Sequence, residues 1–253
     1  MAEKKNRVGE RYFTNEGYEV EVIEYFNKRN LTIKFLYNGK ILKNIFFHNL
    51  KAGGVKNPFK IGGYGVGYFG VGDYKSTDET GNETACYNTW KNMLHRCYAN
   101  STSIRNKSYS ECTVAEEWHN YQNFAKWYKE NYDRGYMVDW VLDKDILIKG
   151  NKIYSPETCA FVPREINLTF VSCSKTKNDY LMGVSFHKRD KKFTTKINID
   201  GKQVHLGYFN TEIEAFLAYK TAKEGHVKRL AEKWKDLVFS NVYDALLKYE
   251  VIP

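Results

Sequence analysis

The sequence lacks the features that mark secreted, zinc-ribbon and membrane proteins. Its five cysteines are odd in number, widely spaced and without a CxxC pair, so they predict neither a disulfide framework nor a paired zinc site. The opening MAEKKNRVGE has no apolar signal-peptide core. No apolar run approaches the roughly 18 residues that a membrane helix needs. These absences predict a cytoplasmic protein that stays reduced and enters no membrane.

The composition is rich in aromatic residues and in positive charge. Hydrophobic residues make up 42% of the chain and aromatic residues 16%, which is enough apolar surface to offset the entropy of folding and excludes a disordered chain. With 253 residues, two or three compact units are expected. The formal net charge of +9 at pH 7 attracts polyanions. Charge alone leaves nucleic-acid binding and a merely basic surface equally open.

Strand-like alternation dominates residues 1–56. Apolar and polar residues alternate along YEVEVIEYF, LTIKFLY and ILKNIFF, and the segments NKRN and NGK separate these runs. Asn38-Gly39 is a hairpin signal, because both residues tolerate the positive φ of a tight turn. We predict a small antiparallel β-barrel over these residues.

Residues 57–85 and the two segments that follow differ in pattern. The first is rich in glycine and has no GxGxxG or GxxxxGK[ST] motif ahead of a helix, so we interpret it as an irregular glycine-rich linker or a docked loop rather than a phosphate-binding loop. Apolar residues at helical spacing predict amphipathic helices over 87–98 and 115–132. The aromatic residues on these helices are expected in the core, since such spacing favours packing over base stacking.

The most informative pattern lies in residues 179–253. Along KFTTKINI, apolar and polar residues alternate, so one sheet face is apolar and the other is polar and basic. Asp200-Gly201 predicts a hairpin, and Thr211 with Glu214 predicts a capping box that begins a helix near residue 212. We expect a three-stranded antiparallel sheet packed on this helix. The helix residues expected to face the sheet are Ile213, Phe216, Leu217, Ala218 and Tyr219.

This segment resembles the ethylene-response-factor (APETALA-type) DNA-binding domain, in the form found in phage and mobile-element proteins. The residues that carry the likeness are Gly183-Val184, Phe193, Ile197, Leu206-Gly207-Tyr208-Phe209, Thr211, Glu214-Ala215 and Ala218-Tyr219. The resemblance implies that the sheet docks in the DNA major groove through its polar, basic face. Ser185 and His187 stand where the family has arginines, and Phe193 stands where it has a tryptophan, so the base preference does not carry over.

Two sets of residues in this region are predicted to contact double-stranded DNA. The resemblance points one set at the groove: Ser185, His187, Lys192, Thr194, Lys196 and Asn198. Basic residues in and before the first hairpin are expected at phosphates, where they set affinity without reading sequence: Lys175, Lys177, Lys188, Arg189 and Lys191. The alternative is an ordinary solvated strand face.

Residues 86–171 resemble phage-type HNH (His-Me finger) endonucleases. The stretches that carry the likeness are YNTWKNMLHRCY, CTVAEEWHNYQNFAKWY and LDKDILIKGNKIYSPETCAFVPREIN. The resemblance implies a ββα core, with a strand ending near Leu142, a strand around Ala160 to Val162 and a helix containing Asn167. Such nucleases need a strand-end histidine to activate water and a metal ion beside the scissile phosphate.

The chain departs from this family at two of three signature positions. Lys144 stands where the general-base histidine is expected and Thr158 where an asparagine is expected, while Asn167 matches. Lysine is a poor base near neutral pH unless burial lowers its pKa. The candidate catalytic and metal residues are Asp143, Asp145 and Asn167, because oxygen ligands suit Mg²⁺. In the alternative, Asp143 caps a turn and Asp145 forms a surface ion pair.

Zinc is the less favoured metal. Tight paired spacing is missing from the residues that would bind it: His95, Cys97, Cys112, His119 and Cys159. Buried, reduced thiols beside tryptophans are the simpler interpretation of these cysteines.

Three functions stay open at this level. The first is a DNA-binding protein of phage or mobile-element origin, acting in a bacterial cytoplasm, with a degenerate HNH core. The second is a metal-dependent homing-type endonuclease that uses Mg²⁺ or another divalent cation. The third is an inhibitor of a host nucleic-acid enzyme, whose basic surface binds a protein partner. The first is favoured slightly over the second.

Overall fold

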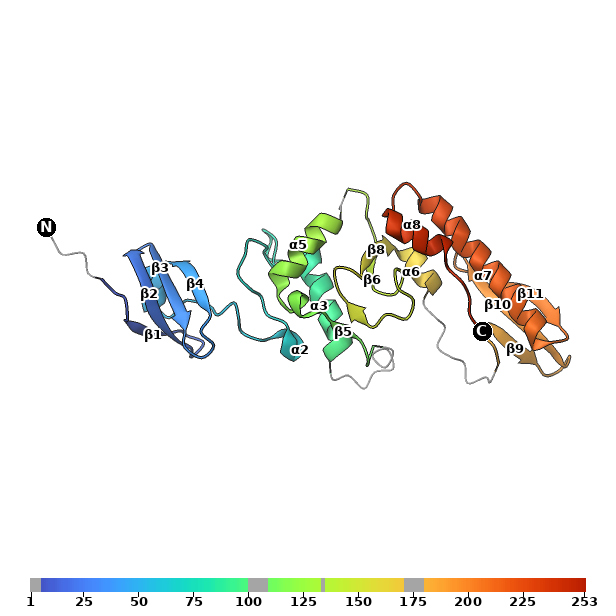
Figure 1. Cartoon of the computed structure of the whole chain (residues 1–253), viewed down its shortest axis with the longest axis horizontal. Coiled ribbons are helices and arrows are strands. Elements are labelled where there is room, and N and C mark those ends of the chain that lie inside the picture. Colours follow the sequence, from blue (N-terminus) through green and yellow to red (C-terminus); the bar gives the residue numbers. More distant parts are fainter. Residues whose placement is uncertain (1–5, 100–108, 133–134, 171–179) are drawn as a thin grey trace. The chain divides into compact units, whose positions relative to one another are not determined.

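The computed structural model describes residues 6–99, 109–132, 135–170 and 180–253 (Figure 1). It combines α-helices with several antiparallel sheets, so the predicted α+β class is confirmed. The chain divides into two compact units, which are Met1–Ser110 with Glu116–Lys126, and Glu111–Ala115 with Trp127–Pro253. We call them unit 1 and unit 2. Within the described ranges, no helix has both the length and the apolar character needed to cross a membrane.

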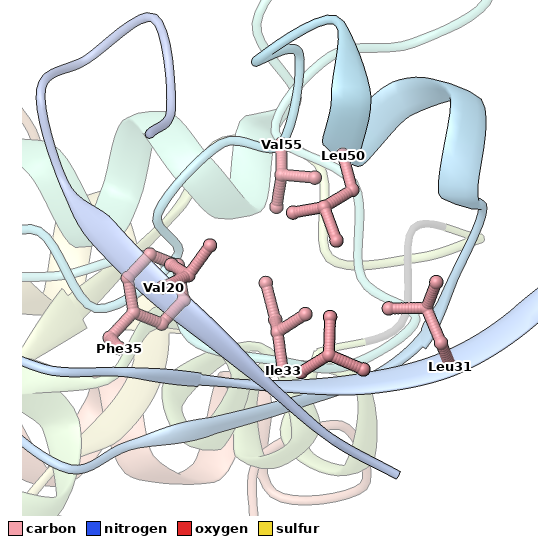
Figure 2. Close-up of a cluster of buried hydrophobic side chains, with 7 residues drawn as sticks. Val20, Leu31, Ile33, Phe35, Leu50 and Val55 are labelled. Carbon is pink, nitrogen blue, oxygen red and sulfur yellow. The ribbon is translucent and has the colours of Figure 1, made fainter. Parts of the chain in front are cut away.

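Unit 1 begins with a four-stranded antiparallel sheet. Its strands, in spatial order, are β1 (Arg11–Phe13), β2 (Glu19–Asn27), β3 (Asn30–Phe35) and β4 (Ile41–Ile45). Valine, leucine, isoleucine and phenylalanine on one face of β2 and β3 are fully buried. The short helix α1 (Phe47–Lys51) covers this face. Figure 2 shows Leu50 and Val55 on the side of the core opposite the strand residues Val20 and Ile33.

The prediction of a closed β-barrel is wrong. β1 and β4 are the two edges of an open sheet and are not hydrogen-bonded to each other. β1 has three residues, all paired with β2, and the apolar face is covered by Leu50 and Val55 instead of by further strands. Alternation within a strand reports which face is buried, but it does not report whether the sheet closes on itself.

The glycine-rich residues 57–85 form a docked segment rather than a free linker. The elements here are α2 (Gly63–Val66), a single irregular turn, and α3 (Ala85–Tyr98). A Cβ atom added at Gly67 would lie 2.5 Å from Leu94 and 2.9 Å from Trp90, both on α3. Glycine therefore permits a close approach of backbone to helix that any side chain would obstruct.

The helix predicted over 115–132 is divided in two. A 3-10 turn, η1 (Glu116–His119), precedes α5 (Tyr121–Asn131). The N–H of Tyr68 donates to the carbonyl of His119, and the N–H of Tyr121 donates to the carbonyl of Tyr68, each at 2.9 Å. These bonds use backbone groups that a continuous helix would pair internally, so the glycine-rich segment interrupts the helix.

Unit 2 contains the ββα arrangement expected from the sequence. β6 (Trp140–Asp143) pairs antiparallel with β8 (Ala160–Pro163), and Leu142 lies opposite Phe161. The helix α6 (Arg164–Phe170) follows directly and packs on both strands. A separate parallel pair joins β5 (Thr113–Val114) to β7 (Ile153–Tyr154).

The C-terminal part of unit 2 is a three-stranded antiparallel sheet against one long helix (Figure 1). The elements are β9 (Val184–His187), β10 (Lys192–Ile199), β11 (Lys202–Phe209) and α7 (Glu212–Trp234), with β10 central. Asp200 and Gly201 have φ values of 51° and 77°, as the predicted hairpin turn requires. The predicted capping box of Thr211 and Glu214 is present. This supersecondary arrangement agrees with the prediction.

Two helix residues predicted to face the sheet do not. Ile213 and Leu217 are 64% and 52% exposed, whereas Ala215 and Phe216 are buried. Tyr219 packs with the buried pair, because positions 215, 216 and 219 share one face of a helix with 3.6 residues per turn. At positions 213 and 217, an aliphatic side chain alone does not indicate that the residue faces the sheet.

The second half of α7 packs on the ββα part of unit 2. The ring of Trp234 makes an edge contact with Trp140, with centroids 5.9 Å apart. The carboxylate of Glu165, on α6, accepts hydrogen bonds from Lys233 at 2.7 Å and from the Trp234 indole. One helix therefore holds the three-stranded sheet and the ββα part together. The final helix is α8 (Ser240–Leu247).

Candidate nucleic-acid interface

The three-stranded sheet has one face packed on α7 and one face open. Cross-strand pairing identifies the side chains of the open face, which we call the outer face: Ser185, His187, Lys192, Thr194, Lys196, Asn198, Gln203, His205 and Tyr208. Alternating residues such as Val184 and Ile197 are buried on the other face. All six residues predicted to face the DNA groove lie on the outer face.

A β-bulge brings Tyr208 to the outer face. Between Thr195 and Lys196 the pairing partner changes from Gly207 to His205, so β11 has one more residue than β10 at this step. Gly207 has a φ of 137°, a conformation that favours glycine. Strict alternation from His205 would place Tyr208 on the covered face. The bulge instead leaves its ring 48% exposed.

Tyr208 lies between two histidines. Its ring centroid is 5.4 Å from that of His187 and 4.8 Å from that of His205. The hydroxyl of Thr194 is 2.8 Å from Nε2 of His205, and Thr194 is only 8% exposed. Thr194, predicted as a groove contact, therefore orients the imidazole of His205 and offers little surface of its own.

The outer face is free of negative charge. β9, β10 and β11 contain no aspartate or glutamate, while Lys192 and Lys196 are exposed along β10. Asn198 is also exposed near the end of the strand. The face thus combines cationic groups, hydrogen-bonding side chains and one exposed aromatic ring, which together suit an anionic, hydrogen-bonding partner.

The turn between β9 and β10 extends this positive charge and contains a single acid, Asp190. The Nε of Arg189 is 2.8 Å from one oxygen of Asp190, and Nδ1 of His187 is 3.2 Å from the other. The hydrogen bond from Arg189 holds the pKa of Asp190 below its usual range. Arg189 is still 83% exposed, and the flanking Lys188 and Lys191 are exposed as well. Two further predicted phosphate contacts lie outside the described residues: Lys175 and Lys177.

The candidate metal residue Asp143 caps the turn that follows β6. Its Oδ1 accepts the backbone N–H groups of Asp145 and Ile146, each at 2.7 Å. Burial raises the pKa of Asp143, an effect that these two N–H groups oppose. This is the turn-capping alternative weighed from the sequence.

Lys144, in the position expected for the general base, is a buried cation. Its side chain is 7% exposed, and its Nζ donates to Oδ1 of Asp145 at 2.6 Å and to the carbonyl of Asn151 at 2.9 Å. Burial disfavours the charge, but the hydrogen bond and the charge of Asp145 outweigh burial and raise the pKa of Lys144. A protonated lysine cannot accept a proton from water.

The remaining signature positions are not joined to these aspartates. Asn167 lies half-buried on α6, and no hydrogen bond among the described residues links it to Asp143 or Asp145. Thr158 donates from its hydroxyl to the carbonyl of Ile153 at 2.7 Å, which closes a turn before β8.

The described residues contain no group of three or more His, Cys, Asp and Glu side chains that could hold a metal ion. Burial raises the pKa of the Cys112 thiol and raises that of Cys159 to about 12. Burial thus favours the protonated thiol at both positions. Cys173 lies outside the described residues.

Three outer-face residues were missed at the level of sequence: Gln203, His205 and Tyr208. Alternation through Val204 and Leu206 signals the first two, because it places Gln203 and His205 on the polar face. Tyr208 could be placed on the outer face only by anticipating the bulge. The sequence signal for the bulge is Gly207, directly before Tyr208.

No protein-family model matches the chain, and neither the curated proteins nor the solved structures contain a significant match.

Proposed function

We propose that the chain is a double-stranded DNA-binding protein that docks the outer face of its three-stranded sheet in a groove of the duplex. The observation that carries the proposal is the outer face itself. The three strands contain no acidic residue, and their outer face presents two exposed lysines, two histidines and an exposed tyrosine ring, while α7 packs on the opposite face.

The chemistry of the outer face complements that of duplex DNA. The major groove is about 12 Å wide, admits β-strands and exposes acceptors on guanine and a donor–acceptor pair on adenine. Lys192 and Lys196 can donate to guanine or to phosphate, and the amides of Asn198 and Gln203 match adenine. The ring of Tyr208 offers an apolar contact for a thymine methyl group. Basic residues of the β9–β10 turn would add phosphate contacts.

The proposal is tested by binding of the full chain to randomised duplex DNA, followed by affinity measurements on a retained sequence. Replacing Lys192→Ala and Lys196→Ala together should weaken binding about tenfold or more, because both cations are removed from the interface. The matched control is Lys235→Ala with Lys248→Ala, which removes two exposed lysines of unit 2 that lie outside the sheet. If both double variants weaken DNA binding equally, the loss of affinity is explained by the lower net charge alone, and the role of the outer face is refuted.

A metal-dependent endonuclease is the second candidate, and the observation that favours it is the ββα arrangement of β6, β8 and α6. The same binding reactions, supplied with Mg²⁺ or Mn²⁺, test it. A nuclease would leave breaks near the bound site, and Asp143→Ala would abolish them without abolishing binding. Binding without breaks supports the first candidate alone.

A further inference from the structure

The turn after β6 contains a buried, positively charged side chain, that of Lys144. The ammonium of Lys144 contacts the Asp145 carboxylate at 2.6 Å and the Asn151 carbonyl at 2.9 Å. The centroid of the Tyr154 ring is 5.9 Å from the same nitrogen. A carboxylate, a carbonyl and an aromatic face are groups that stabilise positive charge in a protein interior.

The surrounding loop is built around this ammonium. The side-chain amide of Asn151 donates to the carbonyl of Lys144 at 2.8 Å and to the carbonyl of Ile153 at 2.7 Å. Asn151 therefore fixes the backbone of Lys144 while its own carbonyl accepts from the Lys144 side chain. The loop between β6 and β7 closes through these bonds, and this closure makes the lysine a structural component.

The HNH-type resemblance implies a divalent metal at this turn, and the residues present do not fit one. Asp145 already neutralises the ammonium, and Oδ1 of Asp143 accepts two backbone N–H groups at 2.7 Å. Both carboxylates thus face positive charge or N–H dipoles supplied by the chain. A divalent ion would have to displace a buried lysine and compete with two N–H donors, so the donor set that Mg²⁺ prefers is not offered here.

We infer that Lys144 is a built-in counter-ion of the Asp145 carboxylate, so that the turn after β6 supplies its own cation and offers no divalent-metal site at Asp143 and Asp145. Unit 2 then folds around its own lysine and needs no metal at Asp143 and Asp145. The inference goes beyond the DNA-binding proposal and does not depend on it, because it concerns the β6 turn and not the outer face.

The first test is a calorimetric titration of the full wild-type chain with Mn²⁺, together with thermal unfolding in Mg²⁺ and in EDTA. The inference predicts no stoichiometric binding at the turn and the same unfolding midpoint in both solutions. A site filled with ligand at a hundred times its dissociation constant would raise the midpoint by several degrees. One-to-one Mn²⁺ binding that Asp143→Ala abolishes would overturn the inference.

The second test removes the internal cation. Lys144→Met keeps the approximate length of the side chain but leaves the 47% exposed Asp145 carboxylate and the Asn151 carbonyl without their donor. The unfolding midpoint should therefore fall by roughly 5 °C. The control is Lys152→Met, since Lys152 is 49% exposed in the same unit and 3.6 Å from Glu111. That exposed pair should change the midpoint by about 1 °C or less.

The unfolding midpoints of the two lysine variants decide between the outcomes. A large loss in Lys144→Met with none in Lys152→Met supports the inference, and so does recovery of part of the loss when Asp145→Leu is added to Lys144→Met. Equal midpoints for Lys144→Met and Lys152→Met would contradict it. Should Lys144→Met fail to fold, the Mn²⁺ titration of the wild-type chain still decides.

Discussion

The hydroxyl of Thr194 lies 2.8 Å from Nε2 of His205, and this bond joins the central strand β10 to the edge strand β11 on the outer face. Because one ring nitrogen of His205 is taken by Thr194, the other is the one left for a ligand. The imidazole also contacts the ring of Tyr208. The His205 imidazole is therefore held in one arrangement on the outer face, which would lower the entropy lost if this face binds DNA as proposed.

Replacing Thr194→Val tests this orientation of His205. Valine keeps the shape of threonine and removes the hydroxyl, so we expect DNA affinity to fall about fivefold, the equivalent of one hydrogen bond worth about 1 kcal/mol. The fold should be kept, because valine suits a strand. Anisotropy titrations against Thr113→Val, an exposed threonine of the same unit, provide the comparison. An unchanged affinity in Thr194→Val would remove His205 from the interface.

Replacing Gly67→Ala tests the docking of the glycine-rich segment on α3. The added methyl group would overlap Leu94 and Trp90, so unit 1 should lose about 1 to 3 kcal/mol of unfolding free energy in urea. Gly62→Ala is the control, since no atom lies within 4 Å of the position of its Cβ. If both variants unfold at the same urea concentration, the segment is not docked.

The buried His226 on α7 should make the stability of unit 2 depend on pH. Burial lowers its pKa, and the nearby Arg229 and Lys223 act in the same direction, while Asp200 and Glu165 oppose them. As the pH falls, His226 therefore takes up a proton in the unfolded chain before it does so in the folded chain. The contribution of His226 to stability is complete above about pH 6.5 and is lost as the pH falls through the lower pKa of the folded state.

Urea unfolding between pH 8 and pH 5 measures this dependence. The wild-type chain should lose more stability over this range than His226→Leu. Parallel pH profiles for the wild type and His226→Leu would show that protonation of this histidine does not affect folding.

Much of unit 2 could be predicted because its signals are local. Asp200-Gly201 fixes a hairpin by its tolerance of positive φ, and Thr211 with Glu214 fixes a helix start through two reciprocal hydrogen bonds. The hairpin and the helix start each depend on residues within a few positions of one another. The strand–strand–helix order around Asn167 was expected instead from the resemblance to HNH-type endonucleases.

What could not be predicted depends on long-range packing. The bulge at Gly207 changes which face Tyr208 occupies, and the register of β10 against β11 establishes it where alternation along β11 does not. The burial of Lys144 depends on a loop that returns through Asn151. The open form of the N-terminal sheet is seen only in the pairing of its strands, because β1 and β4 are not paired with each other.

The most direct test of the outer face as a DNA-binding surface is the salt dependence of binding to a selected duplex. Removing one lysine–phosphate interaction lowers the slope of log K against log salt by about 0.9, so Lys192→Ala with Lys196→Ala should reduce the slope by up to about two and weaken binding. Lys235→Ala with Lys248→Ala should leave the slope unchanged. Identical affinity and slope for the wild type and the Lys192, Lys196 double variant would contradict DNA binding through this face.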